Sequence, residues 1–105
     1  MVKSKEKFNL IIKNNQTFKS NYFIIYMQKS DNERSKFGLA VGKALGNAVA
    51  RNRLKRIYRS VLDQTKFMFP NYSDYIIMVR KPSLLASFED IRKDMKNLLN
   101  ERVKK

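Results

Sequence analysis

The chain has 105 residues, 43% of them hydrophobic, which suits one domain over residues 1–105 with a single modest core. Its 23 Lys and Arg outnumber 9 Asp and Glu, and the resulting formal charge of +14 predicts a polyanionic partner. Nucleic acid is the first candidate, and an anionic membrane surface is the competing one. With no Cys and no His, disulfides, thiolate nucleophiles, imidazole bases and the common zinc sites are excluded.

Membrane insertion and export are not expected either. No apolar stretch approaches the roughly 20 residues that span a bilayer. Residues 1–6 lack the apolar run of a secretory signal. The sequence therefore predicts a cytoplasmic protein that is not inserted in a membrane.

The first patterned segment is a helix. Phe8, Ile11 and Ile12 have the i, i+3, i+4 spacing that predicts a short amphipathic helix over residues 5–14. A short strand is expected next, at residues 17–20.

Two longer strands follow. Residues 22–28 alternate, so Tyr26 is expected on the face opposite to Phe23, Ile25 and Met27. Residues 36–41 alternate in the same way, with Gly38 and Ala40 leaving one face nearly bare. A polar loop at residues 29–35 should connect these strands.

A long cationic helix is predicted after Gly46, with Asn47 as its N-cap. Gly42 and Gly46 are expected to allow a tight, unusual backbone before it, with free amides and the helix dipole facing an anion. Residues 34–62 contain no Asp or Glu but carry eight cations: Arg34, Lys36, Lys43, Arg51, Arg53, Lys55, Arg56 and Arg59. Such runs are usually only solvated faces. Eight cations without one anion favour a binding surface instead.

The charges on this helix gather on one side. At 100° per residue, the polar positions Arg51, Lys55, Arg59, Asn52, Arg56 and Arg53 span 0° to 200° from Arg51. The apolar positions fall between 240° and 340°; they are Ile57, Ala50, Val61, Leu54 and Tyr58. Arginine predominates, and its planar fork suits phosphate recognition.

The remaining elements are one strand and one helix. Residues 74–80 are apolar on both faces, which predicts an interior strand that ends before Pro82. Ser87 and Asp90 resemble a capping box at the start of a last helix, whose apolar stripe is Phe88, Ile91, Met95, Leu98 and Leu99.

This order of elements predicts one sheet with helices packed on it, in an α+β or α/β arrangement. A strand-helix-strand crossover would be right-handed by the general rule. A shallow aromatic platform is a second candidate surface, formed by Phe8, Tyr22, Tyr26 and the bare Gly38 and Ala40. Phe8 could equally be a core residue. No catalytic constellation is present, because the serines lack an imidazole partner and no phosphate-binding glycine loop occurs.

Three segments closely resemble the protein component of bacterial ribonuclease P, namely residues 37–43, 46–56 and 74–82. The Arg51-Asn52-Arg53 segment, framed by Gly-Asn-Ala-Val and Leu-Lys-Arg, is the most specific of these motifs. The resemblance covers nearly the whole chain. It implies an α+β fold of order α-β-β-β-α-β-α, with one four-stranded sheet, a left-handed crossover and a likeness to the second domain of a small-subunit ribosomal protein.

The resemblance also implies a function. The protein would be the accessory subunit of an endoribonuclease that removes the 5′ leader of precursor tRNA, with catalysis and most of the bound Mg²⁺ in the RNA subunit and no cofactor held by the protein alone. Its partners would be ribonuclease P RNA and precursor tRNA, without an obligatory protein partner. The implied contacts to the catalytic RNA are Lys43, Asn47, Arg51, Asn52, Arg53, Lys55, Arg56 and Arg59.

The implied leader-binding cleft contains Phe8, Ile12, Tyr26 and Lys36. Ile12 stands where the family usually has a second aromatic residue, and Ala44 stands where some members carry a lysine. Two other hypotheses remain: a ribosomal-type RNA-binding protein, which would not discriminate precursor from mature tRNA, and a protein-only nuclease, which would cleave without RNA.

Overall fold

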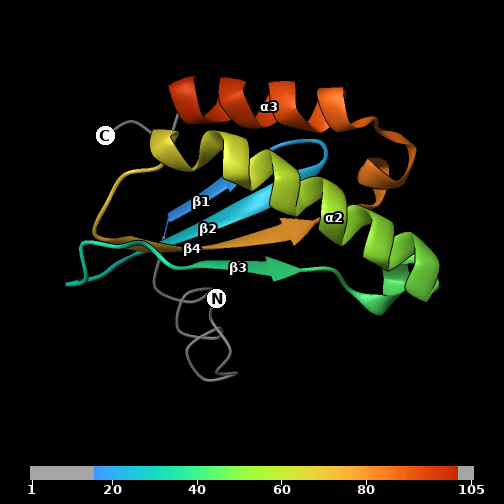
Figure 1. Cartoon of the computed structure of the whole chain (residues 1–105), viewed down its shortest axis with the longest axis horizontal. Helices are drawn as coiled ribbons and strands as arrows, with labels where there is room; N and C mark the ends of the chain where they lie inside the picture. The colour runs from blue at the N-terminus through green and yellow to red at the C-terminus, as the bar shows by residue number, and fades with distance from the viewer. Residues whose placement is uncertain (1–15, 102–105) are drawn as a thin grey trace.

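The computed structural model describes residues 16–101, and four of its strands form one mixed sheet (Figure 1). The strands are β1 (Gln16–Lys19), β2 (Phe23–Lys29), β3 (Phe37–Ala40) and β4 (Ser73–Val79). Their order across the sheet is β1-β2-β4-β3. Strand β2 pairs antiparallel with β1 and β4, while β3 pairs parallel with β4. All four expected strands are therefore present, each within one residue of its predicted position.

Two helices and three short 3₁₀ helices complete the described part of the chain. The helices are α2 (Ala48–Thr65) and α3 (Phe88–Glu101), and the 3₁₀ helices are η1 (Lys43–Leu45), η2 (Lys66–Met68) and η3 (Lys81–Leu85). Both helices lie on the same face of the sheet (Figure 1). The predicted α+β class is confirmed. The helix expected at residues 5–14 lies outside the described residues.

The crossover from β3 through α2 to β4 is left-handed. In Figure 1, β3 and β4 point the same way, β4 lies above β3, and α2 passes in front of the sheet. The expectation from the general rule was wrong here. The handedness implied by the family resemblance is the one observed.

The core lies between the helices and the sheet. From the sheet it receives Phe23, Ile25, Tyr75 and Ile77, and from α2 and α3 it receives Leu54, Tyr58, Val61, Ile91 and Met95, all fully buried. Strand β4 has neighbours on both sides, and its residues Tyr75, Ile76 and Ile77 are at most 1% exposed. The prediction of an interior strand from its two apolar faces is confirmed.

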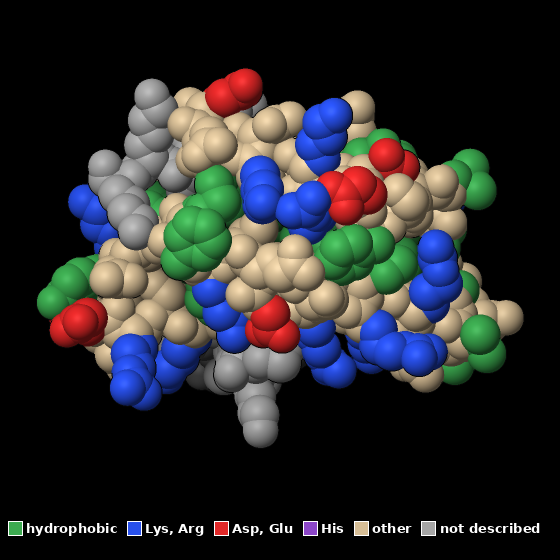
Figure 2. All heavy atoms as spheres, turned by 45° about the horizontal axis from the view of Figure 1, so that its top comes forward, with side chains coloured by type: hydrophobic (Ala, Val, Ile, Leu, Met, Phe, Trp, Pro, Cys, Tyr) green, Lys and Arg blue, Asp and Glu red, His purple; other side chains and the backbone are tan. Residues whose placement is uncertain are grey.

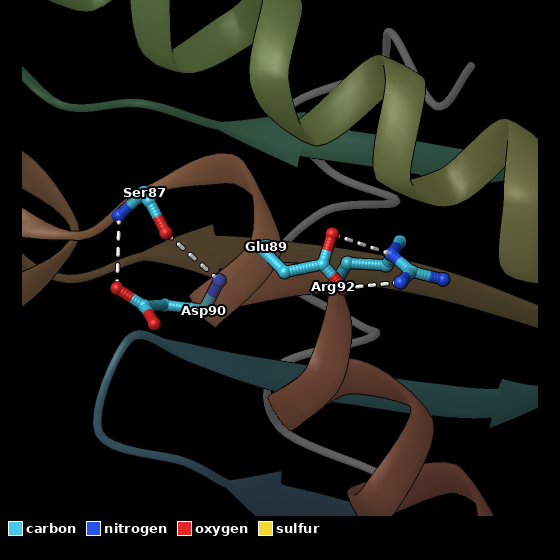
Figure 3. A network of polar contacts seen from close by, with 4 residues as sticks. All are labelled: Ser87, Glu89, Asp90 and Arg92. Carbon is cyan, nitrogen blue, oxygen red and sulfur yellow. Dashed lines mark hydrogen bonds and ion pairs between the residues drawn. The ribbon is translucent and has the colours of Figure 1, made fainter.

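Both helices begin at the expected caps. Asn47 accepts a hydrogen bond from the Ala50 N–H at 3.0 Å through its side-chain oxygen. At α3, the Ser87 N–H donates to Asp90 and the Asp90 N–H donates to the Ser87 hydroxyl, each at 3.1 Å (Figure 3). Asp90 thus completes the reciprocal capping box, as predicted.

Candidate nucleic-acid interface

The loop before α2 is built around one glycine. Gly46 has φ +126°, a backbone conformation that side-chain-bearing residues rarely adopt, and a Cβ there would lie 3.3 Å from the Ala50 Cβ. Gly42 has an ordinary extended backbone at φ −74°, so the predicted unusual conformation is confirmed only for Gly46. Leu45 is 4% exposed and anchors the loop to the core, which leaves Lys43 exposed beside the start of α2.

The predicted angular separation on α2 is confirmed for the apolar positions named above, but the buried Leu62 falls between Arg51 and Lys55 on the helical wheel. Leu54, Tyr58 and Val61 have no exposed surface. The opposite side is the cationic face, which we define as Arg51, Asn52, Arg53, Lys55, Arg56 and Arg59; Arg51 and Lys55 are half-buried and the other four are exposed. Lys and Arg side chains are numerous along the lower part of the view in Figure 2, the side on which α2 lies. The helix thus presents its charges outward from a rigid, core-packed backbone.

These charges have no carboxylate partner within residues 16–101. Ion pairs in that part of the chain join Lys66 to Asp63 at the end of α2, and Arg92 to Glu89 on α3. Figure 3 shows the second pair, in which the Arg92 guanidinium lowers the pKa of the Glu89 carboxyl below its usual range. Unlike α3, the cationic face has no such ion-pair partners among residues 16–101. Its positive electrostatic potential is therefore available to attract an anionic partner molecule.

The other candidate surface lies on the opposite face of the sheet. Tyr26 is paired with Thr17 of β1 and with Ile76 of β4, so its side chain alternates away from the helices, as predicted. Gly38 of β3 is also paired with Ile76 and leaves the same face without a side chain there. Tyr26 is half-buried.

The other predicted cleft residues have different outcomes. Lys36 is exposed immediately before β3, and its N–H donates to Asp74, a 4% exposed carboxylate, at 3.1 Å. Phe8 and Ile12 lie outside the described residues, so their approach to Tyr26 stays a prediction. Tyr26 and the cationic face are on opposite sides of the sheet, so they belong to two separate surfaces.

Sequence reasoning missed one feature beside the cationic face. A pocket of about 240 Å³ opens between β3 and the second half of α2, with Arg59 on its border. Phe37 and Leu39 line it because β3 is an edge strand, which leaves both residues only half-buried. Their alternation predicts a core-facing side but cannot show that β3 lies at an edge.

Two further observations concern residues 16–101 only. No helix there is long and apolar enough to cross a membrane. No group of three or more His, Cys, Asp or Glu side chains is placed in that segment to hold a metal ion.

Comparison with known proteins gives a consistent result. The family model described as Ribonuclease P matches residues 1–103. The "Ribonuclease P protein component" of Mycoplasma mycoides is 37% identical over 96% of this chain and 94% of its own length, and that of Bacillus pumilus is 33% identical over 95% and 85%. Among solved structures, RNase P proteins from Thermotoga maritima and Staphylococcus aureus both superpose with a TM-score of 0.86. The Thermotoga protein shares 27% identity, and its match covers 96% of this chain and 98% of that protein. The Staphylococcus protein shares 25% identity, and its match covers 99% of this chain and 96% of that protein.

Proposed function

Because the chain belongs to the ribonuclease P protein family, we propose that it binds a ribonuclease P RNA through the cationic face and helps that RNA to remove the 5′ leader of precursor tRNA. Membership of the family makes the protein a component of an endoribonuclease. We further propose that the protein binds and positions the RNAs while the RNA subunit carries out catalysis.

The observation that carries the proposal is the cationic face itself. Its cations lie on one side of a helix that is capped by Asn47 and packed against the core through Leu54, Tyr58 and Val61. Three of these cations are exposed, and Arg51 and Lys55 are half-buried. Because no carboxylate among residues 16–101 neutralises them, phosphates can do so and release counterions on binding. We place Lys43 and Asn47 at the border of the same contact, where the positive end of the α2 dipole adds to the field.

The substrate contact belongs to the second surface. We propose that the single-stranded leader crosses the sheet face that carries Tyr26, with Lys36 near its path and Phe8 and Ile12 as further contacts. An aromatic ring that is half-buried and held by a strand can stack on an unpaired base without a large ordering cost. Binding RNA and leader on opposite sides of one sheet would let the protein bridge catalyst and substrate.

The chemistry would be supplied by the RNA and its Mg²⁺ ions. In this proposal the protein positions RNA and leader, and it lowers the Mg²⁺ concentration needed because Arg and Lys offset phosphate repulsion. The protein supplies no general base or nucleophile of its own.

Reconstitution tests this function. The wild-type chain is added to a transcribed bacterial ribonuclease P RNA, and cleavage of a precursor tRNA is followed at low Mg²⁺. We expect faster cleavage, and a loss of that gain in Arg53→Glu. Lys93→Glu, a matched charge reversal at an exposed site on α3, should retain the gain. Tight RNA binding with no gain in cleavage would indicate a ribosomal-type protein, and cleavage without RNA would indicate a protein nuclease.

A further inference from the structure

The pocket between α2 and the edge strand β3 has an apolar floor and a charged rim. Phe37 and Leu39 from β3 and Leu62 from α2 form the floor, while Arg59, Asp63 and Lys66 form the rim. We call it the edge pocket. Its volume of about 240 Å³ is open on the solvent side of β3.

The floor is rigid because Phe37 belongs to an aromatic cluster. Its ring is nearly parallel to Tyr75, with centroids 5.3 Å apart, and meets the edge of Phe69 at 5.0 Å. Tyr75 and Phe69 are buried, whereas Phe37 is half-buried. The cluster therefore fixes the ring of Phe37 and leaves part of it available to another flat, apolar group.

The rim carries both signs of charge. The Lys66 ammonium lies 6.0 Å from the centroid of the Phe37 ring and 3.3 Å from an Asp63 carboxylate oxygen. Lys66 and Asp63 are both largely exposed, so their charges are accessible. A ligand here would meet a carboxylate acceptor between cationic groups, above an apolar floor.

The edge pocket also continues the cationic face. Arg51, Lys55 and Arg59 follow one another at i, i+4 and i+8, about 6 Å apart along the helix axis, and Arg59 is part of the pocket rim. That spacing is comparable to the distance between neighbouring phosphates of one RNA strand. A strand whose phosphates lie along this row would bring a nucleotide to the pocket mouth.

We propose that the edge pocket receives one unpaired, extruded base of the RNA whose phosphates lie along Arg51, Lys55 and Arg59. The inference rests on the proposed function and deepens it. The base would lie against Phe37 and Leu39, while Arg59 and Lys66 would contact the flanking phosphates. Asp63 would accept a hydrogen bond from the exocyclic amino group of adenine, guanine or cytosine, in preference to uracil, whose base offers only its ring N3–H. An acidic peptide would match the cations but would leave the flat apolar floor and Asp63 without complementary groups.

Cross-linking identifies the nucleotide. Because the chain has no cysteine, Lys66→Cys can carry a short photo-cross-linker as the only thiol adduct. With a transcribed bacterial ribonuclease P RNA, we expect cross-links to one unpaired nucleotide. Lys93→Cys on α3 serves as the control and should not reach it. Cross-links only to base-paired nucleotides, or none while the RNA is bound, would overturn the proposal and leave the pocket to a different partner.

Removing the base then tests whether it occupies the pocket. An abasic site at the cross-linked nucleotide should weaken binding of the wild-type protein about tenfold, as expected for one stacked base, whereas an abasic neighbour should not. The exposed-site variant Asp63→Ala should lose the preference for an amino-bearing base over uracil at that position. If Asp63→Ala instead tightens binding to all bases equally, the pocket contributes only charge and the proposal fails.

The two proposals can fail separately. Should wild-type protein neither bind nor activate the RNA, the proposed function is wrong. If activation is normal and the abasic site has no effect, only the base pocket is wrong.

Discussion

The phenolic oxygen of Tyr58 on α2 lies 2.6 Å from the hydroxyl oxygen of Ser83 in η3. Both groups reach the carbonyl oxygen of Tyr22, at 3.1 Å and 2.7 Å, and the Arg80 N–H donates to the same carbonyl at 2.9 Å. Tyr58 and Ser83 have no exposed surface. This network links the helix that carries the cationic face to the entrance of β2 and the segment after β4.

Removing one hydroxyl of this network should reduce stability. Tyr58→Phe keeps the packing of the ring but loses a buried hydroxyl, so we expect the free energy of unfolding to fall by about 1 kcal/mol. Urea unfolding followed by circular dichroism measures it. Because the two hydroxyls contact each other, Ser83→Ala should cost less in the Tyr58→Phe background than in the wild type. Strict additivity would show that the hydroxyls act independently.

Alkaline pH should destabilise the protein through its buried phenols. Burial raises the pKa of Tyr75 to about 12, above the ordinary value of 10. Folding favours the neutral phenol of Tyr75. Its contribution to the free energy of unfolding is therefore fully present below pH 10 and is lost as the pH rises through 12. Tyr75→Phe should therefore show a smaller fall in unfolding free energy between pH 10 and pH 12 than the wild type. Equal falls in urea titrations of the two proteins would contradict the assignment to Tyr75.

Gly46 and Gly42 form a matched pair. Gly46→Ala places a side chain at φ +126° and 3.3 Å from the Ala50 Cβ, so we expect a loss of about 1–3 kcal/mol in stability. Gly42→Ala should be close to neutral, because a Cβ added there would meet nothing within 4 Å and the φ of Gly42 is −74°. Thermal unfolding of both variants tests the difference, and similar melting temperatures would argue against strain at Gly46.

Salt dependence counts the phosphates bound by the cationic face. If about six are neutralised, log affinity for the RNA should fall with log salt at a slope of about −4. Arg53→Ala should weaken binding and make the slope shallower by about 0.7. Filter binding over a salt series provides both numbers, with Lys93→Ala on α3 as the control. An unchanged slope for Arg53→Ala would place Arg53 outside the contact.

Tyr26 should distinguish precursor from mature tRNA. Tyr26→Ala removes the ring on the sheet face opposite α2 and should weaken precursor binding to the holoenzyme by about 1–3 kcal/mol. Binding of mature tRNA, which lacks the leader, should not change. Tyr26→Phe keeps the ring and should bind normally. Equal losses for the two tRNAs would contradict a leader-binding role.

Local features of this molecule could be predicted from sequence because they depend on near neighbours. The caps at Asn47 and Ser87 and the two sides of α2 follow from spacing within one or two helical turns. The interior position of β4 also followed, since both its faces are apolar.

Long-range features could not be predicted in this way. Only the fold places Gly38 of β3 opposite Ile76 of β4, and only the strand order makes β3 an edge. The edge pocket depends on that order and on Phe69 and Tyr75 supporting Phe37 from distant parts of the chain. The left-handed crossover came from family resemblance, because the general rule for parallel strands gives the opposite hand.

The helix that bears the cationic face is itself the connection between the two parallel strands. Pairing of β3 with β4 requires the intervening chain to close a long loop, so it carries a loop-closure entropy cost that is smaller when α2 already lies across the sheet. RNA that binds α2 would hold this connection in place and compensate the mutual repulsion of its charges. RNA binding would then stabilise the folded sheet as well as occupy the surface of α2. Folding of the protein would in this way be coupled to assembly of the ribonucleoprotein.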